Sequence, residues 1–365
     1  MDETIDLGAL RDSIRDVLNA ECPRELIVKH AQHNDGMDRE LWSKAVELGW
    51  TMLTIPEDHG GLGLGIEALA VLHEELGRAA APLPFLSSLL AAKAISDSAD
   101  AAICEAWLPR LAAGAVASLS LPMPLGSTKL SVNCVGDSLV LTGAVLNLLD
   151  GADAEILVLL AKDEHGELVR VVLDVTADGI QPARTTLWDR GRSLANLGLD
   201  GLHIPAERAW PATGAQETAL ANHAAIALAA DSVGGQAAVL DMTIDYLKTR
   251  QQFGRPIGSF QALKHRVADH RTRFEGDIWL LRSAVSAVAG DMDHRATEAS
   301  AAKALATANY VGLGRDAIQL HGGIGFTAEY PIHVFVKRAL LNEQLLGNQA
   351  AHLTRAVSRI VEGAA

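Results

Sequence analysis

The segment Arg250–His265, here called the arginine segment, reads RQQFGRPIGSFQALKH and guides the interpretation of the whole chain. It combines three cations with a Phe-Gly turn, a proline and an apolar run that contains a glutamine. Cationic groups beside aromatic rings favour an anionic, planar ligand. A second segment, Gln319–Ala339, here called the glycine segment, reads QLHGGIGFTAEYPIHVFVKRA. Its glycines break a helix and let a backbone approach a ligand, so the two segments together predict one nucleotide-like site.

Length and composition limit the possible functions. The chain has 365 residues, 49% of them hydrophobic and 21% charged, which is enough for two or three domains with a large core. Its net charge of −14 argues against nucleic acid as a partner, because phosphate binding needs clustered Lys and Arg. No apolar run approaches the ~18–20 residues of a membrane span, so we expect no membrane insertion. The three cysteines lack the spacing of metal ligands, so we expect reduced thiols in a cytoplasmic protein. The sequence has no HExxH-type pair of histidines, so we expect no bound metal.

The pattern of apolar residues divides the chain into three parts. Residues 1–117 have apolar positions at spacings of three and four, which predict helices. Residues 118–210 form short, partly alternating runs separated by Gly and Asp turns, which predict a compact β domain. Residues 211–365 return to long Ala- and Leu-rich helical patterns, which predict a helical bundle.

Over essentially its full length the chain resembles the acyl-CoA dehydrogenase family. The residues LGWTMLTIPEDHGGLGLGIEALAVLHEELGRAAAPLPF, 48–85, are similar to the family's N-terminal domain, and the arginine and glycine segments are similar to its two C-terminal signatures. The resemblance implies an α+β multi-domain fold with an N-terminal helical domain, a middle β-barrel-like domain and a C-terminal four-helix bundle. It also implies FAD, a dimer of dimers, and α,β-dehydrogenation of an acyl-CoA thioester, in which a carboxylate removes the α-proton and hydride passes to the flavin.

The resemblance also assigns residues to the cofactor, which in this family lies at a dimer interface. Carried over by position, Arg250 would contact the pyrophosphate through a charge-assisted hydrogen bond. The residues that would line the nucleotide are Gln252, Phe253, Ile257, Phe260 and Gln261. The residues that would approach the adenosine side are Gln319, Gly322 and Gly323. This half of the FAD site is intact in the sequence.

The half that holds the flavin ring departs from the family pattern. The family usually has Glu-Pro-x-x-Gly-Ser-Asp, where this chain reads LSLPMPLGSTKL. Gly126 and Ser127 can be aligned, but Thr128 stands in place of the Asp. The family's Trp-Ile-Thr or Trp-Ile-Ser triplet is matched by Asn147-Leu148-Leu149. Leu149 cannot donate a side-chain hydrogen bond to a flavin.

The catalytic base is missing from both positions where the family keeps it. By counting, Leu346 occupies one of these positions and Ala224 the other, and Ala225 replaces a basic neighbour. Neither Leu nor Ala can take a proton. Asp231, about two turns after Ala224, is a weak candidate for an unorthodox base, although a helix-packing role is favoured. Glu343 is a weaker candidate still, and a solvated or ion-paired surface position is favoured for it.

Three hypotheses follow for the function. In the favoured one, the chain is a non-catalytic subunit that completes the FAD site of a homologous partner in an α2β2 complex. Such complexes resemble those that oxidise CoA thioesters of steroid side chains, with electron-transferring flavoprotein as the acceptor. The second hypothesis is a self-contained homotetramer that uses Asp231, and the third is a flavin-free scaffold. We expect His265 and His321, which lie within the two segments, to be packing or interface residues, and we expect poor solubility when the chain is produced alone.

Overall fold

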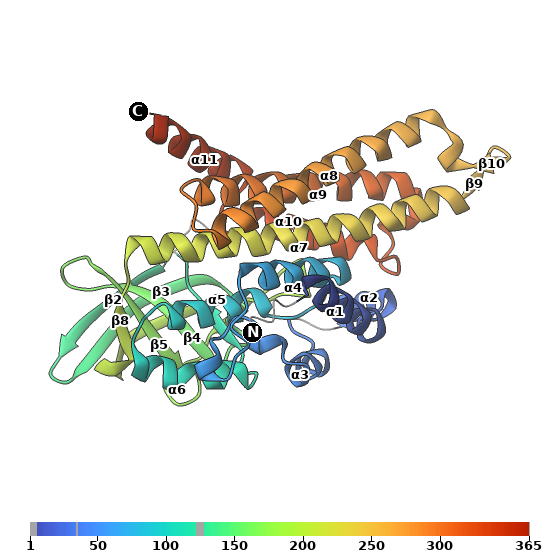
Figure 1. Cartoon of the computed structure of the whole chain (residues 1–365). Helices are drawn as coiled ribbons and strands as arrows, with labels where there is room; N and C mark the ends of the chain where they lie inside the picture. The colour runs from blue at the N-terminus through green and yellow to red at the C-terminus, as the bar shows by residue number, and fades with distance from the viewer. Residues whose placement is uncertain (1–5, 34–35, 122–127, 365) are drawn as a thin grey trace. The chain divides into compact units, whose positions relative to one another are not determined.

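The computed structural model describes residues 6–33, 36–121 and 128–364 (Figure 1). By their internal contacts the described residues form two compact units. The helical unit comprises the described parts of Met1–Asn34, Ile66–Ala81 and Ala225–Ala365. The sheet unit comprises those of Asp35–Gly65 and Pro82–Ala224. Helix α7, Gly214–Thr249, contributes residues to both.

Three helices precede the strands of the sheet unit. They are α3 (Arg39–Glu47), α5 (Phe85–Ser96) and α6 (Ala101–Ala112). Asp38 begins α3 and Asp100 begins α6, and the carboxylate of each accepts hydrogen bonds from two backbone N–H groups of the first turn. Aspartate at this position satisfies donors that a helix cannot pair internally, which fixes where each helix starts.

The strands of this unit form one mostly antiparallel, eight-stranded sheet. They are β1 (Ala117–Leu119), β2 (Thr128–Val135), β3 (Ser138–Leu149), β4 (Ile156–Lys162), β5 (Leu168–Asp174), β6 (Ala183–Thr185), β7 (Leu194–Pro205) and β8 (Ala209–Pro211). The order is β6-β7-β3-β2-β4-β5-β8, with β1 pairing parallel to β4. Within the described residues β6 and β8 end the sheet and do not pair with each other, so the barrel-like middle domain is described more accurately as an open sheet.

The core of the sheet unit is aliphatic. Leu157 and Leu159 of β4 and Val171 and Leu173 of β5 are fully buried and pack in one cluster with residues from β2, β3 and β7. β4 is buried along almost its whole length, which matches its continuous apolar run in the sequence. A strand covered on both faces loses the polar alternation of a surface strand, so this burial explains the pattern.

The helical unit is built mainly from long helices that run side by side (Figure 1). Its elements are α1 (Leu7–Glu21), α2 (Arg24–His33), α4 (Ile66–Ala79), the later part of α7, α8 (Gln261–Ala289), α9 (Arg295–His321), α10 (Ile332–Gln344) and α11 (Gln349–Ala364). A short hairpin, β9 (Gln251–Gln252) with β10 (Arg255–Pro256), separates α7 from α8. Helices, then a sheet, then a helical bundle therefore follow one another along the chain, and the predicted fold class is confirmed.

Two glycines let α4 and α7 cross closely within the helical unit. A Cβ atom on Gly77 would lie 1.9 Å from the carbonyl oxygen of Asp231, and one on Gly234 would lie 1.8 Å from that of Glu74. Such distances are far below van der Waals contact, so any side chain at either position would push the helices apart. This crossing fixes the place of Asp231 in the bundle.

Within the described ranges, none of the helices combines the length and the apolar character needed to cross a bilayer. The domain boundaries after residues 117 and 210 stay a prediction, although α6 ends at Ala112 and α7 begins at Gly214.

Candidate functional site

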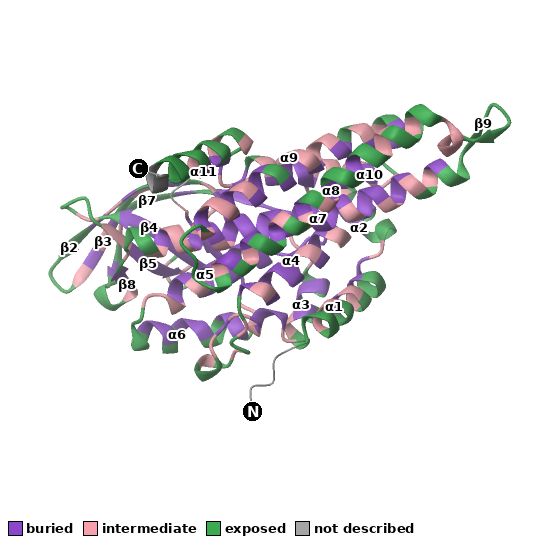
Figure 2. Cartoon of the chain, turned by 45° about the horizontal axis from the view of Figure 1, so that its top comes forward, coloured by how far each residue is buried: buried purple, intermediate pink, exposed green. Residues whose placement is uncertain are grey.

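The arginine segment forms an exposed hairpin after α7. Gln252 pairs with Arg255, and Phe253 and Gly254 between them have φ angles of 53° and 75°. Two consecutive residues with positive φ are the requirement of a tight two-residue hairpin turn, which explains the Phe-Gly pair in the sequence. Arg250 and the hairpin residues are exposed, as the green colour of β9 shows (Figure 2).

Aromatic contacts connect this hairpin to Phe260, the residue before α8. The rings of Phe253 and Phe260 meet edge to face with centroids 6.0 Å apart, and the Arg255 guanidinium lies 4.2 Å from the centre of the Phe260 ring. Phe253 is nevertheless 90% exposed. A large aromatic side chain that is exposed to water favours a binding role.

The glycine segment turns sharply at the end of α9. Gly322 has φ 63° and ψ −140°, a conformation that is essentially restricted to glycine. A Cβ atom on Gly322 or on Gly323 would meet nothing within 4 Å, so the backbone here borders open space. Gln319, Gly322 and Gly323 are all exposed, and a ligand could therefore reach their backbone and amide groups.

A cluster of three rings joins the two segments at one end of the bundle. Tyr246, one turn before Arg250, stacks on His321 with ring centroids 4.5 Å apart, and Tyr330 lies 4.9 Å from His321. His321 is buried, its Nδ1 lies 2.7 Å from the Ala317 carbonyl oxygen, and burial lowers its pKa. These contacts agree with the packing role expected for His321, whereas His265 is exposed near the start of α8.

The residues at this end fit the nucleotide half of FAD. An exposed guanidinium at Arg250 suits a pyrophosphate, and an accessible glycine backbone suits close approach by a flat or charged group. Ile257 and Phe260 are half-buried behind the hairpin, whereas Gln252 and Gln261 are exposed. The cavities described within the helical unit have volumes of about 740 and 330 Å³, and none of the predicted nucleotide residues lines either of them. The predicted nucleotide residues thus lie outside both of these cavities.

The described residues that are predicted to face the flavin ring lie in strands β2 and β3 of the sheet unit. Asn147 has φ 55° and lies at a β-bulge, where the register of β3 against β7 shifts between Val145 and Leu148. The Asn147 backbone N–H donates to the side-chain oxygen of Asn196. Thr128 begins β2, whereas Gly126 and Ser127 lie outside the described residues. A bulge re-aims side chains, and here it leaves Leu149 as the last residue of β3.

The two positions that the family resemblance assigns to the catalytic base carry no carboxylate. Ala224 is fully buried in α7. Leu346 is half-buried between α10 and α11 and has φ 61°, an uncommon value for a side chain of this size. The Glu343 carboxylate instead accepts hydrogen bonds from its neighbours Gln344 and Gln349, which agrees with the surface role favoured for it.

Asp231 is engaged in the core of the bundle. Its carboxylate lies 3.1 Å from the Arg338 guanidinium and accepts a hydrogen bond of 2.6 Å from the Asn342 amide. Arg338 also donates to the carbonyl oxygen of Ala81. Asp231 and Arg338 are 0% and 1% exposed. A carboxylate held by two buried donors is a poor base for a substrate proton, so these contacts favour the packing role.

The loop around Leu346 is held by two residues that the sequence analysis did not single out. The buried Lys303 ammonium donates to the carbonyl oxygen of Glu343, in the last turn of α10, and to that of Gly347, beyond its end. Nε2 of His352 lies 3.0 Å from the Leu346 carbonyl oxygen. Burial lowers the pKa of Lys303 to about 8 and that of His352 to about 3. A lone Lys in an Ala-rich helix and a lone His give no sequence signal for such a contact.

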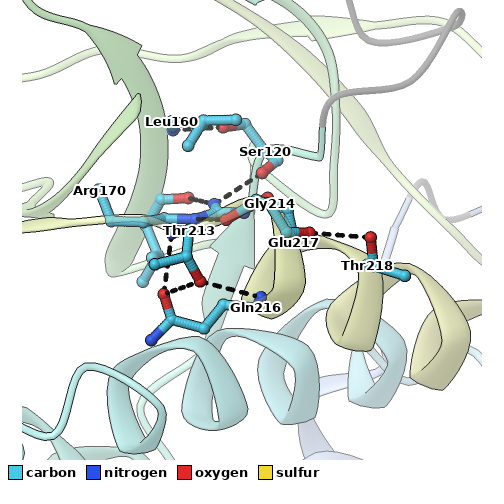
Figure 3. A network of polar contacts seen from close by, with 9 residues as sticks. Ser120, Leu160, Arg170, Thr213, Gly214, Gln216, Glu217 and Thr218 are labelled. Atoms are coloured by element: carbon cyan, nitrogen blue, oxygen red, sulfur yellow. Dashed lines mark hydrogen bonds and ion pairs between the residues drawn. The ribbon is translucent and has the colours of Figure 1, made fainter. Parts of the chain in front are cut away.

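A second buried network supports the sheet unit (Figure 3). The Arg170 guanidinium donates to both carboxylate oxygens of Glu217, at 2.9 and 2.6 Å, and to the Ser120 carbonyl oxygen at 2.7 Å. The Ser120 hydroxyl accepts a hydrogen bond from the Leu160 backbone N–H. The network fixes the chain just before the region aligned with the family's ring-binding motif. Among the described residues no group of His, Cys, Asp or Glu is arranged to hold a metal ion.

Comparisons with known proteins match both the N-terminal helices and the part of the chain that contains the arginine and glycine segments. The family model for the acyl-CoA dehydrogenase N-terminal domain matches residues 4–115, and the model for the C-terminal domain matches residues 214–361. The acyl-CoA dehydrogenase IpdE2 of Mycobacterium tuberculosis is 33% identical over 354 residues, covering 94% of this chain and 96% of the relative.

Two solved structures are similar over nearly their full length. The "Tcur3481-Tcur3483 steroid ACAD G363A variant" has a TM-score of 0.87 and 30% identity, covering 98% of both chains. The ChsE4-ChsE5 complex from Mycobacterium tuberculosis has a TM-score of 0.89 and 26% identity, covering 99% of both chains. Each of these two structures carries a two-component name.

Proposed function

Since the chain belongs to the acyl-CoA dehydrogenase family, whose members are FAD-dependent oxidoreductases acting on CH–CH bonds, we propose that it is a non-catalytic subunit of a heteromeric member. In this proposal it supplies the nucleotide half of an FAD site to a homologous chain, which supplies the ring contacts and the base. FAD, when bound, accepts the hydride in α,β-dehydrogenation of the acyl-CoA thioester.

One contrast carries the proposal. The exposed end of the bundle carries a cation, an exposed aromatic ring and an open glycine backbone at Arg250, Phe253 and Gly322. The positions counted for the base hold Leu346 and Ala224 instead. Without a base, the chain gains nothing from these residues in a reaction of its own, whereas a partner that carries the base would gain an FAD contact from them.

The nature of the partner and substrate is proposed from the similar proteins. The two related structures carry two-component names, and one of them is described as a steroid enzyme, so we propose an α2β2 complex with a homologous chain and a steroid side-chain CoA thioester as substrate. Electron-transferring flavoprotein is the proposed acceptor. The ion pair between Asp231 and Arg338 weakens the alternative of a self-contained enzyme.

The proposal is tested by removing the cation predicted to contact the pyrophosphate. The chain is co-expressed with its homologous partner, and FAD per pair of chains is measured by absorbance. Arg250→Ala should weaken FAD retention by about ten- to a hundredfold, the usual effect of losing one charge-assisted hydrogen bond. Lys248→Ala, which removes an exposed cation two residues away, is the matched control and should keep the wild-type content. Equal FAD retention in the two variants would contradict the proposal.

A further inference from the structure

A cavity of about 330 Å³ lies within the helical unit, at the corner between α1 and α2. Its apolar wall is formed by buried side chains from α1, α2, α7 and α10 and from the turn that joins the first two, namely Leu18, Cys22, Ile27, Ala238 and Phe335. Asn19, Arg24 and Glu25 line it from the exposed side, where it meets water. Sites for small ligands typically occupy about 300–1,000 Å³, so this cavity suits a small organic molecule.

Three arginines line the polar side of the cavity, and each comes from a different helix. They are Arg15 of α1, Arg24 of α2 and Arg78 of α4. Two of them are fixed in place by carboxylates. Nε and Nη2 of Arg15 donate to the two oxygens of Glu75 at 2.9 and 2.7 Å, and Nη2 of Arg78 donates to Asp241 at 2.7 Å. A guanidinium has five N–H groups, so both arginines keep donors for a ligand.

The carboxylates of the lining do not use up these donors. Glu75 is 2% exposed and also accepts a hydrogen bond of 2.9 Å from Arg11, so two guanidinium groups share its charge. Glu25 is exposed to water in the first turn of α2. In the part of the chain that the structure describes, Arg24 forms no ion pair, and it interacts electrostatically with the phenol of Tyr330, which is uncharged at neutral pH because burial raises its pKa. The polar side of the cavity therefore offers more donors than acceptors.

We propose that this cavity binds a small organic anion. Its carboxylate or phosphate group accepts hydrogen bonds from Arg24 and from the remaining N–H groups of Arg15 and Arg78, because guanidinium groups match the geometry of both kinds of anion. Its apolar body packs against Leu18 and Phe335, which a purely polar ligand would leave uncovered. None of the predicted nucleotide residues lines this cavity, so the site goes beyond the proposed function and does not depend on it.

Isothermal titration calorimetry of the co-expressed complex measures this binding with two probes, benzoate and phenyl phosphate. They share an apolar ring and differ in the anionic group, so the stronger of the two tells a carboxylate site from a phosphate site. The stronger probe should bind with a Kd of about 1 mM or tighter. Benzamide, which has a similar shape but no charge, should bind at least about tenfold more weakly. Inorganic phosphate, which has no apolar body, should also bind about tenfold more weakly than the stronger probe.

Two variants of this chain locate the bound probe. Arg24→Gln removes an exposed cation that is not needed for packing, and it should weaken binding of the stronger probe by about ten- to a hundredfold. Lys29→Gln removes an exposed cation from the same helix but outside the cavity, and this matched control should bind the probe as the wild type does. Cys22→Met places a longer, flexible side chain in the cavity, so it should also weaken binding, by occupying the space of the apolar ring.

The outcomes separate this inference from the proposed function. Binding of neither probe, or equal binding by the wild type and Arg24→Gln, overturns the inference, and so does binding that Arg24→Gln weakens but Cys22→Met leaves unchanged, because the probe would then lie on the surface. FAD per pair of unlike chains and the absorbance spectrum of the flavin should be the same with and without probe. If no heteromer forms, the proposed function fails, and the same titrations on this chain alone decide the inference.

Discussion

Tyr246 and His321 stack with ring centroids 4.5 Å apart, and this contact joins two segments that are about seventy residues apart in the chain. Tyr246 precedes the exposed hairpin that contains Phe253, and His321 precedes the glycine turn at Gly322. Because this contact links the ends of α7 and α9, it places the hairpin and the turn at the same end of the bundle. The proposed nucleotide surface is therefore formed before any partner arrives, which lowers the cost of binding.

Gly322 offers a test of the turn beside this contact. Gly322→Ala places a side chain at φ 63°, ψ −140°, so we expect the free energy of unfolding to fall by about 1–3 kcal/mol. Gly323→Ala is the matched control, because its added Cβ meets nothing and its φ lies outside the left-handed region. Its effect should stay within about 0.5 kcal/mol. Urea unfolding measures both, and equal stabilities would contradict the assigned turn.

The buried pair of Asp231 and Arg338 gives a second prediction. Asp231→Asn removes a charge that the Arg338 guanidinium contacts at 3.1 Å, and it leaves that cation buried without its counter-ion. Breaking such a pair typically costs about 3–5 kcal/mol, so the melting temperature should fall sharply. Differential scanning calorimetry checks this. A variant with wild-type stability but no dehydrogenase activity would show instead that Asp231 acts as the base.

His352 gives a prediction about pH. Burial first, and then the nearby Lys303 and Arg355 cations, lower its pKa to about 3 from the ordinary value of 6.5. Between these values the unfolded chain binds a proton that the folded chain does not, so the contribution of His352 to stability is present above pH 6.5 and lost as the pH falls. The loss approaches about 1.4 kcal/mol per pH unit.

The measurement compares the wild type with His352→Gln, which keeps a donor for the Leu346 carbonyl oxygen but does not titrate. Between pH 6.5 and pH 4.5 the wild type should lose about 2 kcal/mol more stability than the variant. Parallel stability curves for the two proteins across this range would show that His352 is not held neutral by its surroundings.

The sequence predicts some parts of this structure well and others poorly, for physical reasons. Apolar periodicity depends on local geometry, so the long helices and the run that becomes β4 were predictable. The Phe-Gly pair at 253 and 254 likewise predicts the turn that the structure shows there. By contrast, Asp231 meets Arg338 across 107 positions of sequence, and Arg170 meets Glu217 across 47. Such contacts depend on how helices and strands pack, which no local pattern encodes.

Some features of the candidate functional site could likewise be predicted from the sequence and others could not. Residues of the arginine and glycine segments could be singled out as candidates because their types and spacing are unusual, and their binding role stays a prediction. The bulge at Asn147 was not predicted, since an extra residue in a strand leaves no compositional mark. Lys303 and His352 were missed because their role is to satisfy backbone carbonyl oxygens near Leu346, and the need for such donors appears only when the helix end is placed.

The amount of FAD bound per chain tests the central claim most directly. It should be measured by absorbance on this chain purified alone and again on the chain co-purified with its homologous partner. The account predicts no FAD on the chain alone and one FAD for each pair of unlike chains, because Arg250 and Gly322 would face a flavin ring held by the partner. One FAD on every copy of this chain purified alone would contradict that claim.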